Sequence, residues 1–311
     1  MITRRDLLRM SAAGMAGLSL VSPSALWAAE DEPQSAAGQD SADTGQRRRR
    51  PRGFRIGVCD WNLGKTSDPG CFEVAKQIGL DGVQVSLGTA ANDMHLRKPE
   101  VQKAFLDASE KTGVRIASLA IGEMNEVPYK SDPRAEQWVA DSIDVCTALR
   151  VRVVLLAFFG KGDLIDDKAG LDAVVEKLKK VAPKAEKARV QLGFESWLSA
   201  EQHLDILKRV GSPALKVYYD VGNSHLRGYD IYKEIRMLNK NICEFHAKDY
   251  DKLFGQGKVD FPKVRAAMDE IGYRGWIHIE GATPLGLIES YKKDAEYLRS
   301  IFPREVPAAT T

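Results

Sequence analysis

The stretch that decides the fold runs from Arg189 to Gly281. It contains four apolar segments of strand length, and each carries, near its end, a residue that can bind a hard metal ion or transfer a proton. These residues are Glu195 in VQLGFES (190–196), Asp220 in LKVYYDVGN (215–223), His246 in ICEFHAKD (242–249) and Glu280 in WIHIEG (276–281). By subtraction their spacings are 25, 26 and 34 residues, which suits one strand, one helix and two loops, the βαβ unit. Side chains at the carboxyl ends of parallel strands meet at one end of the sheet, so the pattern predicts a metal site there.

The same alternation extends over residues 54–303, about 250 residues, the usual length of a single (β/α)₈ barrel. Further strands are predicted at 54–61, 82–86, 114–121 and 151–159, all rich in Val and Ile and mostly apolar. Helices are predicted at 70–79, 98–112, 133–149, 167–188, 200–210, 229–239, 261–271 and 286–301. The fold class is therefore α/β, a closed (β/α)₈ TIM barrel. An open doubly wound sheet is the less favoured alternative, because no GxGxxG motif follows the first strand.

The composition excludes some classes of function. The chain has 311 residues, of which 44% are hydrophobic and 28% charged, as in an ordinary globular protein with a large core. The net charge is only +2 and much of the basic excess lies in the N-terminal tail, so a nucleic-acid partner is not expected. The four cysteines form no CxxC pair, which argues against a zinc ribbon or a disulfide framework.

The N-terminal residues 1–29 have the layout of an export signal. Arg4 and Arg5 precede an apolar run that is too short for a confident membrane span, and the segment resembles a twin-arginine (Tat) signal. It predicts the Tat export machinery as a partner and the periplasm or cell envelope as the location. An ordinary secretion signal and an uncleaved anchor are the alternatives. Residues 30–53 are predicted to form a disordered linker that ends in an arginine cluster. Residues 304–311 are predicted to form a disordered tail.

Several runs in the last four predicted strands resemble a known family. The runs GFESW, YYDVGNSH, EFHAKD, GQGKVDF and GYRGWIHIEGA are similar to the sugar phosphate isomerase/epimerase family of xylose isomerase-like TIM barrels, which includes ketose 3-epimerases and inosose dehydratases. The resemblance implies metal ligands at Glu195, Asp220, His246 and Glu280. It also implies that Glu195 and Glu280 are the catalytic acid/base pair.

The donor types agree with that resemblance. Three carboxylates and one imidazole suit one divalent ion that prefers oxygen ligands. Mn²⁺ is the favoured ion, Mg²⁺ and Co²⁺ are alternatives, and Zn²⁺ also accepts this set of ligands. Such an ion would stabilise the negative charge of an enediolate made from a sugar, while two glutamates on opposite faces remove and return a proton. Taken singly, Asp220 could merely stabilise a turn, and His246 could be a satisfied core histidine.

Other residues are weaker candidates for contact with a carbohydrate substrate. Lys248 shares its side of the strand with His246. Two tryptophans follow predicted strand ends, where aromatic faces commonly stack on sugars, and core packing is the alternative for both. The full set of predicted substrate-binding residues is Lys248, Trp61, Trp197, Glu123 and His225.

Three functions remain open from the residues. The favoured one is a metal-dependent sugar isomerase or epimerase. A lyase or dehydratase acting on a keto-sugar or keto-glycoside would use the same site, and a non-catalytic carbohydrate-binding barrel is the third. The trinuclear zinc site of endonuclease IV, a DNA-repair relative of the resembled family, is not expected because Asn223 replaces a histidine. Gly281-Ala282-Thr283 is only a weak phosphate cradle, and the sequence leaves open whether the protein is a homo-oligomer.

Overall fold

The computed structural model describes residues 53–305. The predicted signal segment, the linker up to residue 52 and the last six residues of the tail lie outside the described residues. Within residues 53–305, no helix is both long enough and apolar enough to cross a membrane.

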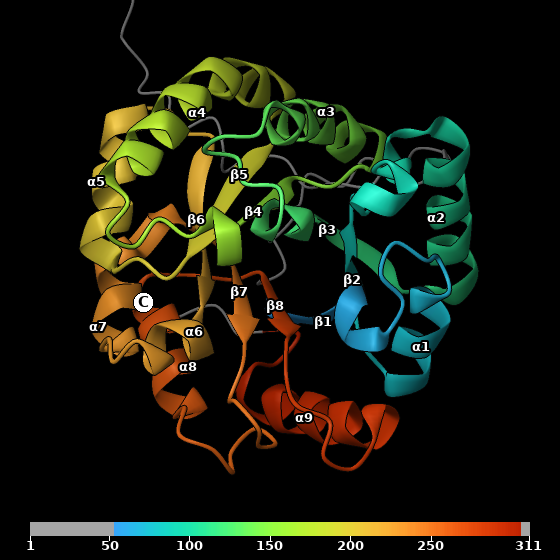
Figure 1. Cartoon of the computed structure of the whole chain (residues 1–311). Helices are drawn as coiled ribbons and strands as arrows, with labels where there is room; N and C mark the ends of the chain where they lie inside the picture. Colours follow the sequence, from blue (N-terminus) through green and yellow to red (C-terminus); the bar gives the residue numbers. More distant parts are fainter. Residues whose placement is uncertain (1–52, 306–311) are drawn as a thin grey trace, which may run out of the picture. The chain divides into compact units, whose positions relative to one another are not determined.

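Eight parallel strands form a closed barrel in which each strand pairs with the next in sequence, and β8 pairs with β1 (Figure 1). The prediction of a (β/α)₈ barrel is confirmed. The strands are β1 (Arg55–Cys59), β2 (Gly82–Ser86), β3 (Arg115–Ile121), β4 (Val153–Phe158), β5 (Gln191–Ser196), β6 (Leu215–Asp220), β7 (Ile242–Ala247) and β8 (Trp276–Ile279). Closure brings the carboxyl ends of all eight strands to one mouth, where TIM barrels build their sites.

The helices surround this ring and lie within two residues of the predicted ends (Figure 1). They are α1 (Cys71–Ile78), α2 (Pro99–Thr112), α3 (Pro133–Leu149), α4 (Lys168–Ala188), α5 (Ala200–Val210), α7 (Ile231–Leu238), α8 (Phe261–Glu270) and α9 (Leu287–Ile301). Local chemistry explains their ends. Asp132 and Asp260 are the N-caps of α3 and α8, and each of these helices has a proline in its first turn.

A short extra helix, α6 (Val221–Leu226), occupies a segment for which the sequence predicts no helix. Asp220 explains the difference, because it is the N-cap and its Oδ1 accepts a hydrogen bond from the Asn223 amide at 2.8 Å. The predicted metal ligand is therefore also the residue that starts this helix.

The first strand is shorter than predicted. It ends at Cys59, and Trp61 belongs to a 3₁₀ helix, Asp60–Leu63. The buried carboxylate of Asp60 sets this bend, since it accepts hydrogen bonds from the amides of Ser67 and Ser86 and from the Ser86 hydroxyl. Burial nevertheless raises the pKa of Asp60 to about 6. The bend carries Trp61 to the mouth of the barrel.

The lumen is more polar than the apolar strand pattern predicts. The Tyr218 hydroxyl accepts a hydrogen bond from the Gln84 amide nitrogen at 3.0 Å and lies 2.7 Å from His278 Nδ1. All three side chains are buried. Small residues opposite make room for these large groups. A Cβ on Gly57 would lie 2.6 Å from the His278 ring, so no other residue fits without a shift of that ring. A buried polar network of this kind fixes side-chain positions because every change leaves a partner unpaired.

The loop after β5 is held by a buried histidine. His203 on α5 places Nε2 3.0 Å from the Ser196 hydroxyl and Nδ1 2.9 Å from the Ser199 carbonyl. Since a carbonyl can only accept, Nδ1 carries the proton and Nε2 accepts from Ser196, which describes a neutral ring. Burial lowers the pKa of His203 to about 4.

Because its pKa is lowered, His203 should make the free energy of unfolding smaller in acid. Its folded pKa lies below the unfolded value of 6.5, so its stabilisation is present above pH 6.5 and is lost as the pH falls towards 4. Between pH 7 and 5 this one group should remove about 2 kcal/mol from the free energy of unfolding. Denaturant unfolding of wild type and His203→Gln at both pH values measures it. The variant should be less stable at pH 7 but should lose less on acidification, and parallel losses would contradict the assignment.

Candidate metal centre

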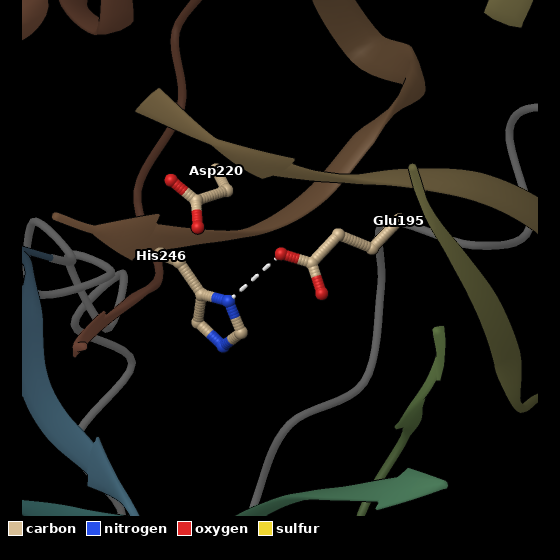
Figure 2. A group of neighbouring side chains, drawn as sticks. All are labelled: Glu195, Asp220 and His246. Atoms are coloured by element: carbon tan, nitrogen blue, oxygen red, sulfur yellow. Dashed lines mark hydrogen bonds and ion pairs between the residues drawn. The ribbon is translucent and has the colours of Figure 1, made fainter. Parts of the chain in front are cut away.

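Three of the four predicted ligands form one buried cluster at the barrel mouth. Glu195, Asp220 and His246 come from the neighbouring strands β5, β6 and β7, and Asp220 is the register partner of His246 (Figure 2). One ligand atom of each lies within 4.8 Å of the others, and their exposed fractions are 5%, 3% and 1%. Among residues 53–305 this is the cluster of three or more His, Cys, Asp or Glu side chains whose geometry could hold a metal ion.

The cluster fits a divalent cation. His246 Nδ1 lies 3.0 Å from Glu195 Oε1. Asp220 uses Oδ1 to cap α6, whereas its Oδ2 is buried with no hydrogen-bond partner. An unpaired buried carboxylate oxygen is costly, and a bound cation would satisfy it. Two carboxylates and an imidazole nitrogen are a donor set that Mn²⁺, Mg²⁺, Co²⁺ and Zn²⁺ all accept.

The orientation of His246 is set from below by Gln84. The Gln84 amide nitrogen donates to Ser118 Oγ at 3.1 Å and to the Tyr218 hydroxyl at 3.0 Å, so its oxygen is left to face His246. That oxygen lies 3.0 Å from His246 Nε2, which therefore carries a proton. Nδ1 is then the nitrogen directed at the two carboxylates, and a second partner of this kind commonly fixes a ligating histidine.

Glu280 lies beside the cluster rather than inside it. Its Oε2 is 4.0 Å from His246 Nδ1 and 2.8 Å from Lys248 Nζ, while its Oε1 accepts a hydrogen bond from Trp61 Nε1 at 3.2 Å. Lys248 Nζ also stands 3.9 Å from Asp220 Oδ2. Lysine and tryptophan thus hold the second glutamate at the edge of the centre.

Burial and charge push the pKa values of these groups apart. Burial raises the pKa of Asp220, although Lys248 opposes the shift. Burial would do the same to Glu280, but His246 and Lys248 outweigh it and lower its pKa. The pKa of His246 is raised well above its ordinary value, because its contacts with Cys59 and Glu195 outweigh the effect of burial. The carboxylates of the cluster therefore favour a positive charge between them, either a proton on His246 or a bound cation.

The predicted substrate-binding residues divide into two groups. Lys248 and Trp61 reach the centre, since both bind Glu280, Lys248 also pairs with Asp220, and the Trp61 ring meets the His246 ring edge-on. The others do not contact the cluster. His225 is hydrogen-bonded to the Tyr250 hydroxyl, Trp197 packs edge-on against Phe159, and half-buried Glu123 lies in the 3₁₀ helix Gly122–Asn125.

Sequence reasoning gave no role to two neighbours of His246. The Sγ of Cys59 lies 3.3 Å from His246 Nε2. The Oε1 of Gln84 lies 3.0 Å from the same nitrogen. Position in the strand is the one available clue, because Gln84 interrupts the apolar β2 segment GVQVS and every residue of that strand is buried. A buried glutamine in the middle of such a strand indicates a contact inside the barrel.

The fold and the cluster define a TIM barrel with a candidate divalent-metal centre at its carboxyl-terminal mouth. The chain belongs to the xylose isomerase-like TIM barrel family, whose model matches residues 72–301. It is 24% identical over 230 residues to an L-ribulose-5-phosphate 3-epimerase of Escherichia coli (strain SMS-3-5), covering 67% of this chain and 80% of that one.

Solved structures share the fold at lower identity. D-allulose 3-epimerase from Methylomonas sp., in complex with D-allulose, superposes with a TM-score of 0.66 at 15% identity, covering 81% of this chain and 98% of that one. D-psicose 3-epimerase from Clostridium cellulolyticum H10, with D-tagatose, gives 0.66 at 18% identity, covering 80% and 99%.

Metal affinity should rise with pH. Asp220 and His246 both have raised pKa values, and a ligand must lose its proton before it binds. Affinity for Mn²⁺ should therefore increase from pH 6 to 8, by up to about tenfold per unit for each proton released. Calorimetric titration in buffers of different ionisation enthalpy counts those protons. Asp220→Asn should bind more weakly with a shallower dependence, and a pH-independent affinity in wild type would contradict the centre.

Removing the support under His246 should weaken metal binding without removing a ligand. Gln84→Leu takes away the oxygen that faces Nε2, and loss of such a partner typically costs about 10–100-fold in affinity. Ser118→Ala removes only one of the two acceptors of the Gln84 amide, so its loss should be smaller. Equilibrium dialysis with Mn²⁺ measures both, and thermal melts report whether each variant is folded. Equal affinity in all three proteins would exclude this role for Gln84.

Proposed function

We propose that this protein is a divalent-metal-dependent sugar isomerase or epimerase that acts by moving a proton next to the carbonyl of a sugar or keto-sugar. The observation that carries the proposal is the buried Glu195, Asp220 and His246 cluster with a second glutamate, Glu280, held beside it. Support also comes from the relatives, which are named as sugar or sugar-phosphate epimerases and share the family.

Glu195, Asp220 and His246 would hold the ion, with Glu280 close enough to join them. A divalent ion at this place would polarise a substrate carbonyl and stabilise negative charge on its oxygen. We favour Mn²⁺ because the set combines carboxylates with a single imidazole.

The proton transfers fall to the two glutamates. The lowered pKa of Glu280 keeps it ionised near neutral pH, which is the state a base needs. Lys248 and Trp61 each bind one of its oxygens, so the carboxylate is oriented before the substrate arrives. Glu195, whose Oε1 lies 3.0 Å from His246 Nδ1, would return the proton from the opposite face of the substrate. Removal of the proton by one carboxylate and its return by the other would invert the configuration of the carbon, with an enediolate as the intermediate.

A lyase or dehydratase remains the second candidate, since elimination next to a carbonyl begins with the same proton abstraction. Products separate the two outcomes, because elimination yields an ultraviolet-absorbing enone and epimerisation does not. We further propose that the protein is exported by the twin-arginine machinery to the periplasm or cell envelope, on the basis of the Arg4-Arg5 pattern at its start.

Deuterium exchange tests the proposed chemistry. Mn²⁺-loaded wild type should introduce solvent deuterium into a ketose at the carbon next to the carbonyl, followed by mass spectrometry or NMR. Glu280→Gln and Glu195→Gln should each slow exchange by about 10²–10⁴-fold, because one member of the acid/base pair is lost. Glu110→Gln, on the exposed surface of α2, is the matched control and should behave like wild type.

Two results would overturn the proposal. One is a wild-type protein that exchanges no ketose with Mn²⁺, Mg²⁺, Co²⁺ or Zn²⁺ and binds sugars equally well in both glutamine variants, which would favour a carbohydrate-binding barrel. The other is exchange that survives both substitutions.

A further inference from the structure

A separate cavity of about 390 Å³ lies next to the metal centre, between α6 and the loop that joins β7 to α8. It falls within the roughly 300–1,000 Å³ range of small-molecule pockets. Its walls are formed chiefly by His225, Leu226, Tyr250, Lys252, Gln256 and Lys258. None of the metal-cluster residues lines it, so it is an additional space rather than the metal site itself.

Both walls of the cavity start at the metal centre. α6 begins directly after Asp220, and the opposite loop begins directly after Lys248. The Tyr250 hydroxyl ties the walls together, since it donates to the Gly222 carbonyl at 3.3 Å and lies 2.9 Å from His225 Nδ1. In Figure 1, α6 is seen next to the end of β7. A sugar held at the cluster could therefore place a substituent in this cavity.

The charges around the cavity cancel. Lys252 is paired with Asp251 at 3.2 Å, and the lining holds one further lysine, Lys258, and one further aspartate, Asp249. The Asp249 carboxylate is fully buried and accepts hydrogen bonds from the loop amides of Lys258 and Val259. A phosphate dianion is usually bound by a surplus of cationic donors. Two lysines balanced by two aspartates favour an uncharged group instead.

The lining also combines apolar surface with hydrogen-bonding groups. Leu226 is 60% exposed, more than any other large hydrophobic residue within 53–305, and it stands on the wall of this cavity. The Tyr250 and His225 rings meet edge to face beside it, and the Gln256 amide lies in the same lining. A sugar ring presents apolar C–H faces and polar edges, so these walls match it better than they match a small ion.

The conformation of Tyr250 is a further sign that the cavity wall is built for a purpose. Its φ is +58°, in the left-handed region that bulky residues avoid. Such outliers persist where the surrounding structure holds them, and they gather at ligand sites. Here the hydroxyl contacts to Gly222 and His225 hold the ring against the cavity.

We propose that the substrate is a keto-sugar carrying an uncharged second ring, a glycoside of disaccharide size, and that the second ring occupies this cavity. The inference rests on the proposed function for the position of the first ring. The structure thus assigns α6 and the β7–α8 loop as the part of the site that selects what is attached to the reacting sugar.

A matched ligand series tests this assignment. D-fructose, its uncharged glucosyl and galactosyl derivatives lactulose (O4), leucrose (O5) and isomaltulose (O6), and D-fructose 6-phosphate share one ketose and differ in the substituent. Affinities for the full chain loaded with Mn²⁺ are measured by calorimetry. At least one disaccharide should bind about tenfold or more tightly than D-fructose and more tightly than the phosphate.

Variants of the cavity wall should remove that gain selectively. Leu226→Ala and Gln256→Ala should bring the preferred disaccharide to within about twofold of D-fructose, while D-fructose itself binds as in wild type. Leu106→Ala, an exposed leucine on α2, is the control and should keep the gain. Thermal melts establish that each variant is folded.

Three outcomes would overturn the assignment. They are disaccharides that bind no better than D-fructose, no binding of any ligand in the series, and tightest binding of the phosphate with loss of that preference in Lys252→Ala or Lys258→Ala. Deuterium exchange into the same ligands separates the two proposals. Exchange without a disaccharide gain contradicts only the cavity, whereas a gain without exchange into any ligand contradicts only the chemistry.

Discussion

Negative charge buried at the barrel mouth is the constraint on which the rest of the site depends. Glu195, Asp220 and Glu280 lie around one imidazole, and burying these carboxylates together is costly because each loses hydration and like charges repel. Lys248 offsets part of this cost through Glu280, and the pKa of Asp220 is still raised, first by burial and then by the neighbouring glutamates. A folded protein keeps such an arrangement where a cation or a reaction needs it.

The interior of the barrel extends this constraint downwards. His246 can present Nδ1 to the carboxylates because Gln84 occupies Nε2, and Gln84 is in turn held by Ser118 and Tyr218. Tyr218 continues the chain of contacts to His278, for which Gly57 leaves the room. The position of one ligand is therefore fixed by residues from β2, β3, β6 and β8, and closure of the barrel is what brings them together.

The proposed chemistry and the proposed selectivity lie in different parts of the barrel. The strand ends carry the buried cluster and the proposed acid/base pair. The segments that follow the strands carry α6, the β7–α8 loop and the cavity, and no residue of the cluster lines that cavity. Proteins similar to this chain are named for a ketose in one case and for a sugar phosphate in another, so the fold alone does not set the substrate.

The sequence by itself determined the strand and helix order, the closed barrel and the four residues at the ends of the last four strands. Periodicity and spacing are local properties, and parallel strands in a closed sheet have their carboxyl ends on one side by geometry alone. Only the tertiary structure decided which polar groups meet. The contacts of Gln84 and Cys59 with His246 span 162 and 187 residues, and no local pattern predicts them. Likewise, α6 appeared where a turn was expected because Asp220 caps it, and the cavity exists because Tyr250, in the loop after β7, reaches back to α6. Such contacts depend on the packing of side chains from distant strands, which becomes definite only when the barrel closes.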